Sequence, residues 1–158
     1  MFEYTEEQII QAHFDYQKQY DLLRIYQRID NISTAIVNAS EHILILSNIK
    51  GKLPVELHEQ TKDLLSLIIS EHSLFKQALE QYENDKSDVI GTIHRVIECD
   101  QSVNEVCNIC IEKLYLAANR NELSLGTFRA IEHIYSNLQF LGTKIEKAAT
   151  SLEWLLIS

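Results

Sequence analysis

The chain has 158 residues and a formal net charge of −9. A chain of this length is expected to form one domain, residues 1–158, with its own core. Its acidic balance and its lack of clustered Lys and Arg exclude nucleic acid as a partner and disfavour docking on anionic lipid. Four glycines and one proline leave few sharp turns, which favours a small number of long helices.

The sequence predicts a cytoplasmic protein without direct membrane insertion. No apolar run reaches the roughly 20 residues that a membrane-spanning helix needs. Residues 1–14 also lack the basic start and apolar centre of a signal peptide. Cys99, Cys107 and Cys110 fall in one helical segment, and no second CxxC or CxxH completes a zinc site. We therefore expect reduced core thiols.

The first two helices are expected at about residues 6–48 and 54–82. Thr5 begins a capping box, and Gly51 and Pro54 mark the boundary between the two helices. Apolar residues repeat in alternating steps of three and four, as in the seam of a helix bundle. In the first helix the stripe is Leu22, Ile25, Ile29, Ile32, Ile36, Ala39, Ile43 and Leu46; in the second it is Leu57, Leu64, Ile68, Phe75 and Leu79.

The third and fourth helices are expected at about residues 88–118 and 124–157. Ser87 and Asp88 provide the start of the third helix, and Asn119–Asn121 interrupts the pattern after it. The third stripe is Val89, Ile93, Val96, Asp100, Val103, Cys107, Cys110 and Leu114; the fourth is Phe128, Ile131, Tyr135, Leu138, Gly142, Ile145, Ala149 and Leu152. No segment alternates with period two. The fold class is therefore all-α, an antiparallel bundle of four long helices.

Asp100 is the one charged residue in the third apolar stripe. An unpaired carboxylate at a core position is costly. Three explanations are open: a bound cation, a buried basic or hydrogen-bonding partner, or a position at a wet edge of the seam. His72, near the inner stripe of the second helix, is a candidate partner.

Three pairs of oxygen-bearing side chains have the same i,i+4 spacing, which puts both members on one helix face. The pairs are Asp30 with Thr34, Asp100 with Asn104, and Gln139 with Thr143. This spacing is typical of a metal-binding motif, but only Asp30 and Asp100 retain a negative charge.

The blocks around these pairs resemble the PhoU-like family, including its branch associated with Pit-type inorganic phosphate transporters. Residues 134–158, starting Ile-Tyr-Ser-Asn-Leu-Gln, are similar to the family's last helix, I-Y-x-x-L-E-x-x-x-D with an aliphatic end. Residues 100–115 resemble its E-x-x-x-D followed by Leu-Phe, and residues 21–36 resemble D-I-x-x-L-x-x-x-L-D-D-I-x-D-A-I. The resemblance covers about residues 21–158 and implies a PhoU-like bundle.

In metal-binding members of that family, E/D-x-x-x-D motifs gather iron or similar cations into multinuclear clusters. Here four of the six expected charges are missing, and neutral oxygens offset the desolvation of a hard cation poorly. The resemblance leaves two alternatives. Either a single divalent or ferric ion binds at Asp30 or Asp100, helped by Glu98 or Glu146, or the pairs are relict polar contacts between helices. No other cofactor is expected.

Longer family members carry two further helices before the region of Asp21. We expect Ile9, His13, Tyr16 and Tyr20, or a second subunit, to cover the apolar surface that this leaves. The long first seam offers a self-complementary surface, which favours a homodimer.

The resemblance implies a non-catalytic cytoplasmic regulator or accessory protein of inorganic phosphate transport. Its expected partner is the cytoplasmic face of a phosphate transporter or a sensor kinase. No catalytic centre is evident: none of the six histidines follows a Glu or Asp by three residues, as di-iron bundles require. The alternative is a helical scaffold or adaptor dimer unrelated to phosphate transport.

Overall fold

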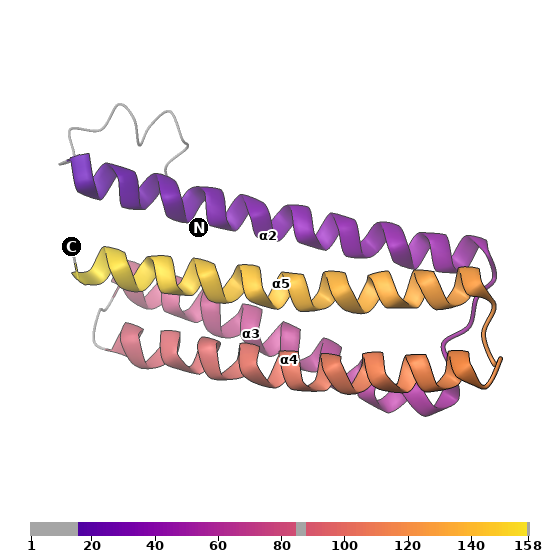
Figure 1. Cartoon of the computed structure of the whole chain (residues 1–158). Coiled ribbons are helices and arrows are strands. Elements are labelled where there is room, and N and C mark those ends of the chain that lie inside the picture. Colours follow the sequence, from indigo (N-terminus) through magenta and orange to yellow (C-terminus); the bar gives the residue numbers. More distant parts are fainter. Residues whose placement is uncertain (1–15, 85–87, 158) are drawn as a thin grey trace.

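The computed structural model describes residues 16–84 and 88–157, and within them four long helices and no strand (Figure 1). The helices are α2 (Tyr16–Asn48), α3 (His58–Asn84), α4 (Val89–Asn119) and α5 (Leu125–Ile157), with a 3-10 helix, η1 (Val55–Leu57), before α3. The predicted all-α bundle is confirmed. The capping box at Thr5, the residues Ile9 and His13, and Ser87 lie outside the described residues.

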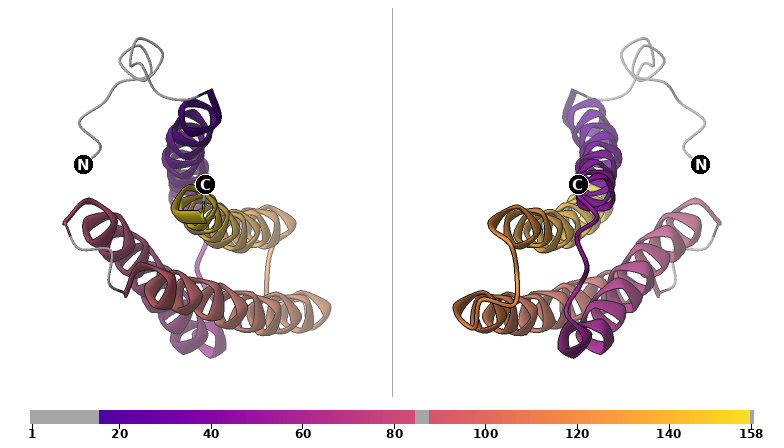
Figure 2. Two further views of the ribbon diagram at one scale, coloured as in Figure 1. Left: turned by 90° about the vertical axis from the view of Figure 1, so that its left-hand side faces the viewer. Right: turned by 90° about the vertical axis from the view of Figure 1, so that its right-hand side faces the viewer.

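Consecutive long helices run in opposite directions, and α5 lies at the centre of the arrangement (Figure 1). α3, α4 and α5 all contact one another, whereas α2 contacts α5 and no other helix in the described part of the chain. Figure 2 shows this end-on, with α2 on one side of α5 and the α3–α4 pair on the other. The bundle is therefore a three-helix unit with a fourth helix attached to its central member.

The main core fills the space between α3, α4 and α5. Every member of the predicted α4 stripe is buried except Asp100, which is half-buried. Tyr135 is fully buried there, and its hydroxyl lies 2.6 Å from Thr61 Oγ1 on α3. α5 carries a second buried row that continues around the helix: Ile134, Leu141, Ala148 and Leu155. Two buried rows are expected of a helix with neighbours on two sides.

Only half of the predicted α2 stripe is well covered. Ile25, Ile32 and Ala39 are buried. The alternate members, which lie seven residues apart, are partly buried or exposed: Leu22, Ile29, Ile36 and Ile43. A heptad seam normally buries both of its alternating positions, so α2 has one covered and one largely open row.

The turn after α2 differs from the sequence expectation. The residue with left-handed backbone is Lys50, with φ 53°, and not Gly51. The Gly51 amide donates to the Leu46 carbonyl and the Lys50 amide to the Ser47 carbonyl, which together form a Schellman cap. A Cβ at Gly51 would lie 2.5 Å from Leu46 Cδ1 and 3.1 Å from Thr127 Oγ1, so a larger residue there requires these side chains to shift.

The start of the second predicted helix also differs from expectation. Pro54 precedes η1, and α3 proper begins at His58, so the proline is not in the first turn of α3. A proline has no N–H to donate, and its carbonyl accepts instead from the Leu57 amide. At the end of α4, by contrast, the structure agrees with the prediction. The helix ends at Asn119, and Asn121 just after it has a left-handed backbone with φ 59°.

Candidate functional site

The structure brings together two of the three oxygen-bearing pairs. Asp100 and Asn104 on α4 lie beside Gln139 and Thr143 on α5, near the middle of the three-helix unit. Asp30 and Thr34 are exposed on α2, which contacts neither α3 nor α4 in the described structure. The α2 pair is therefore apart from the other two.

Amide side chains link α4 to α5 at the paired motifs. Asn104 Nδ2 donates to Asp100 Oδ2 at 2.9 Å, and Gln139 Nε2 donates to Asn104 Oδ1 at 2.8 Å. Thr143 Oγ1 donates to the Gln139 carbonyl at 3.3 Å within α5. These neutral groups satisfy one another, as expected of polar contacts between helices. They also hold the Asp100 carboxyl in place through one of its two oxygens.

The residue nearest the other oxygen of Asp100, Glu71, is not among the predicted site residues. Glu71 on α3 is completely buried, and neither of its carboxyl oxygens has a hydrogen-bond partner among the described residues. Asp100 Oδ1 is also buried without a partner. A signal existed in the sequence, because Glu71 falls between Ile68 and Phe75 at the spacing of the buried stripe.

The prediction that His72 is a partner of Asp100 is wrong. Its side chain is exposed, and its neighbour Glu71 occupies the inward position. A helix turns about 100° per residue, so adjacent residues face different surroundings.

Gly142 on α5 lies against both unpaired carboxyls. A Cβ at this glycine would lie 3.0 Å from Asp100 Oδ1, 3.1 Å from Glu71 Oε2 and 3.1 Å from Val103 Cγ1. The three helices thus contribute two carboxyls and a glycine to one point in the core. We call Glu71, Asp100 and Gly142 the carboxyl cluster.

Burial strongly favours the protonated form of Glu71. Its pKa is raised to about 9, first by desolvation and then by the charges of Asp100 and Glu146. The pKa of Asp100 is also raised, by burial and by Glu146, against the opposing effects of the Asn104 hydrogen bond and Lys147. The carboxyls therefore compete for negative charge, and any cation that reaches them relieves this repulsion.

A multinuclear metal cluster does not fit these residues. In the described part of the chain, no three His, Cys, Asp or Glu side chains are grouped so that they could hold a metal ion. The neutral side chains of Asn104, Gln139 and Thr143 stand where charged ligands would be needed, and they bond to neighbours.

The cysteines have the environment expected of core thiols. Cys107 and Cys110 are buried and Cys99 is half-buried, and all three are free thiols. Cys107 donates to the Tyr135 carbonyl and Cys99 to the Leu67 carbonyl, each at 3.4 Å. Burial raises the pKa of Cys107 to about 12, so its reactive thiolate form is suppressed at neutral pH.

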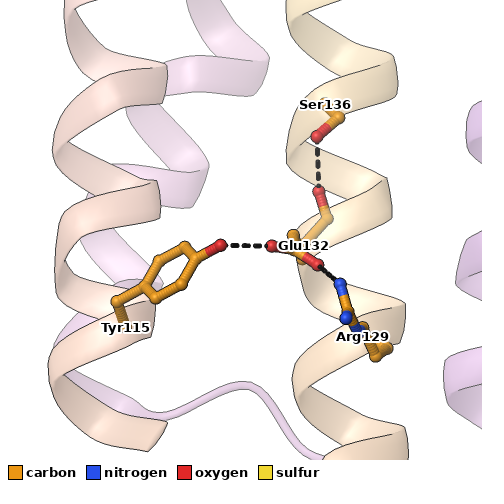
Figure 3. A network of polar contacts seen from close by, with 4 residues as sticks. All are labelled: Tyr115, Arg129, Glu132 and Ser136. Atoms are coloured by element: carbon orange, nitrogen blue, oxygen red, sulfur yellow. Dashed lines mark hydrogen bonds and ion pairs between the residues drawn. The ribbon is translucent and has the colours of Figure 1, made fainter. Parts of the chain in front are cut away.

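A second polar network lies on the surface between α4 and α5 (Figure 3). Tyr115 donates to Glu132 Oε1 at 2.6 Å, and Arg129 contacts Glu132 Oε2 at 2.8 Å. Ser136 donates to the backbone carbonyl of Glu132 at 2.9 Å. Both carboxylate oxygens of Glu132 are occupied by protein donors, so this network joins two helices and offers no free reactive group.

An open apolar surface runs along the second half of α2. Its members are between 46% and 61% exposed and lie at i, i+1, i+7 and i+8, on one side of the helix: Ile36, Val37, Ile43 and Leu44. We call these four residues the α2 row. Large apolar side chains grouped in this way commonly mark an interaction site.

None of the described helices is both long enough and apolar enough to cross a bilayer. No family model matches the chain, and no curated protein or solved structure matches it.

Proposed function

We propose that this protein is a non-catalytic regulator or accessory protein that works through protein–protein contacts, with the α2 row as its contact surface. The observation that supports this proposal is that α5 covers one row of apolar side chains on α2 and leaves the neighbouring row exposed. Its Ile25, Ile32 and Ala39 pack on α5, while the α2 row lies open beside them. A partner helix placed along this row would complete the heptad seam that the sequence of α2 specifies.

The apolar area of the α2 row is too small to hold a complex together by itself. Burying the exposed half of four Ile, Val and Leu side chains contributes roughly 3–6 kcal/mol. That is near the lower end of the cost of association, about 4–15 kcal/mol. A stable complex therefore needs further contacts, which a homodimer supplies by repeating each contact about its two-fold axis.

On this proposal the protein acts in the cytoplasm and regulates inorganic phosphate transport. The resemblance of residues 21–36, 100–115 and 134–158 to PhoU-like proteins supports it. The partner on this proposal is the cytoplasmic face of a phosphate transporter or its sensor kinase. The alternative is a scaffold dimer unrelated to phosphate, and the same α2 row supports that alternative.

The test is phosphate uptake in cells that lack the gene, complemented with wild type or with the double variant Ile36→Glu/Leu44→Glu. The matched control is Ile69→Glu, which changes an apolar side chain on α3 that is 66% exposed. Wild type and the control should restore normal uptake, and the double variant should not, although circular dichroism shows that it folds.

Two outcomes contradict the proposal. A folded double variant that restores uptake as wild type does would exclude the α2 row. Unchanged uptake on loss of the gene would exclude phosphate transport. If the double variant then also converts a dimer to a monomer in analytical ultracentrifugation, the scaffold alternative is correct.

A further inference from the structure

A groove runs along the first half of α2 and reaches the end of α5, which lies beside it (Figure 1). Its larger part has a volume of about 480 Å³, and the described residues that line it all come from α2: Tyr20, Leu23, Arg24, Gln27, Arg28 and Asn31. A smaller hollow of about 230 Å³ continues past Tyr20 and Arg24 to Trp154 and Ile157 on α5. We call the two parts together the arginine groove.

The two arginines of the groove lack a counter-charge in the described part of the chain. The other three arginines each bond to a side chain of the protein. Arg24 and Arg28 bond to none among the described residues, although the chain has 23 Asp and Glu. Asp21, three residues before Arg24, is buried and accepts a hydrogen bond from Gln17 instead. Because both arginines are also half-buried, an anion beside them is favoured.

The spacing of the two arginines suits the carboxylates of a protein segment. Arg24 and Arg28 are an i,i+4 pair, which sets their Cβ atoms roughly 6 Å apart on one face of α2. Each guanidinium group has a fork of N–H donors that matches the two oxygens of a carboxylate. Acidic residues on successive turns of a helix, or two apart in a strand, have about the same separation. Gln27 adds an amide group between the two arginines.

The form of the groove favours a long ligand over a small molecule. Sites for small molecules enclose most of the ligand, whereas the larger part of the arginine groove is lined by the face of one helix. From Tyr20 to Asn31 this face extends roughly 16 Å along α2. At the other part of the groove, Tyr20, Trp154 and Ile157 are each more than half exposed and offer an apolar contact.

We propose that an acidic segment of a partner protein lies along the arginine groove, with carboxylates on Arg24 and Arg28 and an apolar side chain against Trp154. The net charge of −9 repels such a segment from most of the surface, which confines it to this groove. The groove is separate from the α2 row, because Arg24 lies about 120° around the helix from Ile36. On this proposal α2 has two contact surfaces, one basic and one apolar.

Trp154 is the only tryptophan of the chain, so its fluorescence reports directly on the groove. The probe is a peptide that repeats Leu-Glu-Glu-Ala four times, which has no aromatic residue and places glutamates at i,i+4. Added to the full chain at low salt, it should shift the emission of Trp154 to shorter wavelength, and the shift should saturate. Binding should weaken as NaCl is added, because salt screens the ion pairs. The same peptide with Gln in place of every Glu should bind at least about tenfold more weakly.

Variants of the full chain locate the binding. Arg24→Gln/Arg28→Gln should weaken binding of the Glu peptide by at least about tenfold, because both forks are lost. The matched control is Lys52→Gln/Lys62→Gln, which removes two exposed cations outside the groove and should bind as wild type does. Far-UV circular dichroism should show that both double variants are folded.

The proposal is overturned if wild type does not bind the Glu peptide, or if the arginine variant binds it as tightly as wild type. It is also overturned if the lysine control loses as much affinity, because the attraction is then general and not a property of the groove. If the chain binds the peptide only after Glu3, Glu6 and Glu7 are changed to Gln, its own first residues occupy the groove and the partner is excluded. These results stand apart from the test of the α2 row, which keeps both arginines.

Discussion

Replacing Glu71 with Gln should make the protein more stable at neutral and alkaline pH. The reason is the pKa of Glu71, which is about 9 in the folded chain against 4.5 as the ordinary value. A carboxyl whose folded pKa is raised holds its proton better in the folded state than in the unfolded state. Its contribution to stability is complete below pH 4.5 and is lost as the pH rises toward 9.

The size of the effect follows from that difference in pKa. Between these limits the free energy of unfolding of the wild type should fall by about 1.4 kcal/mol per pH unit. At pH 7.5, three units above the ordinary value, the loss is on the order of 4 kcal/mol. The contribution of Asp100 to the free energy of unfolding also falls as the pH rises, because its pKa is raised as well. Gln cannot ionise, so the variant lacks the Glu71 part of this slope.

The assay is urea unfolding followed by far-UV circular dichroism at a series of pH values from 5 to 9. The two proteins should have similar stability at pH 5, and the variant should be more stable by pH 8. Part of the gain is offset because the buried amide needs partners of its own, at about 1–3 kcal/mol for an unsatisfied group. Parallel pH profiles for the two proteins, or a variant that is less stable at pH 8, would refute the reasoning.

Two further predictions concern the contact between Tyr135 and Thr61 in the core and the turn after α2. Tyr135→Phe removes the buried hydroxyl that lies 2.6 Å from Thr61 Oγ1, and it should lower the free energy of unfolding by about 1 kcal/mol. Thr61→Val in the same background should then cost little more, and full additivity in this double-mutant cycle would show that the two hydroxyls do not interact. Gly51→Ala places a methyl group 2.5 Å from Leu46 Cδ1, so it should lower the free energy of unfolding by roughly 1–3 kcal/mol. The unfolding midpoint should fall with it. An unchanged midpoint would mean that the turn after α2 relaxes freely.

The helices themselves were readable from the sequence because each is specified by local rules. The α4 stripe from Val89 to Leu114 repeats at helical spacing, and the structure buries each of its members except Asp100. The end of α4 near Asn121 followed from turn chemistry in the same way. At the end of α2, however, the left-handed residue is Lys50, because the backbone hydrogen bonds of the cap place that conformation one residue before Gly51.

The candidate site was only half readable. Asp100 stood out because it is a charge in an apolar stripe. Glu71 occupies an equivalent position on α3, but a sequence does not say which residues of two helices lie at the same level. That depends on how α3, α4 and α5 are aligned along their axes. The closeness of Glu71, Asp100 and Gly142 is therefore a property of the packing.

The sequence by itself predicted four long helices, the bounds of α4 and α5 to within a few residues, and most of the buried faces of those two helices, since periodicity and capping act within one helix. The tertiary structure alone decided that α2 contacts only α5, and therefore that Ile36 and Ile43 of its seam stay open. It also decided that Asp30 lies apart from Asp100. The physical reason is that a seam specifies which side of a helix is buried, whereas the choice of neighbour depends on how all four helices share the available apolar surface.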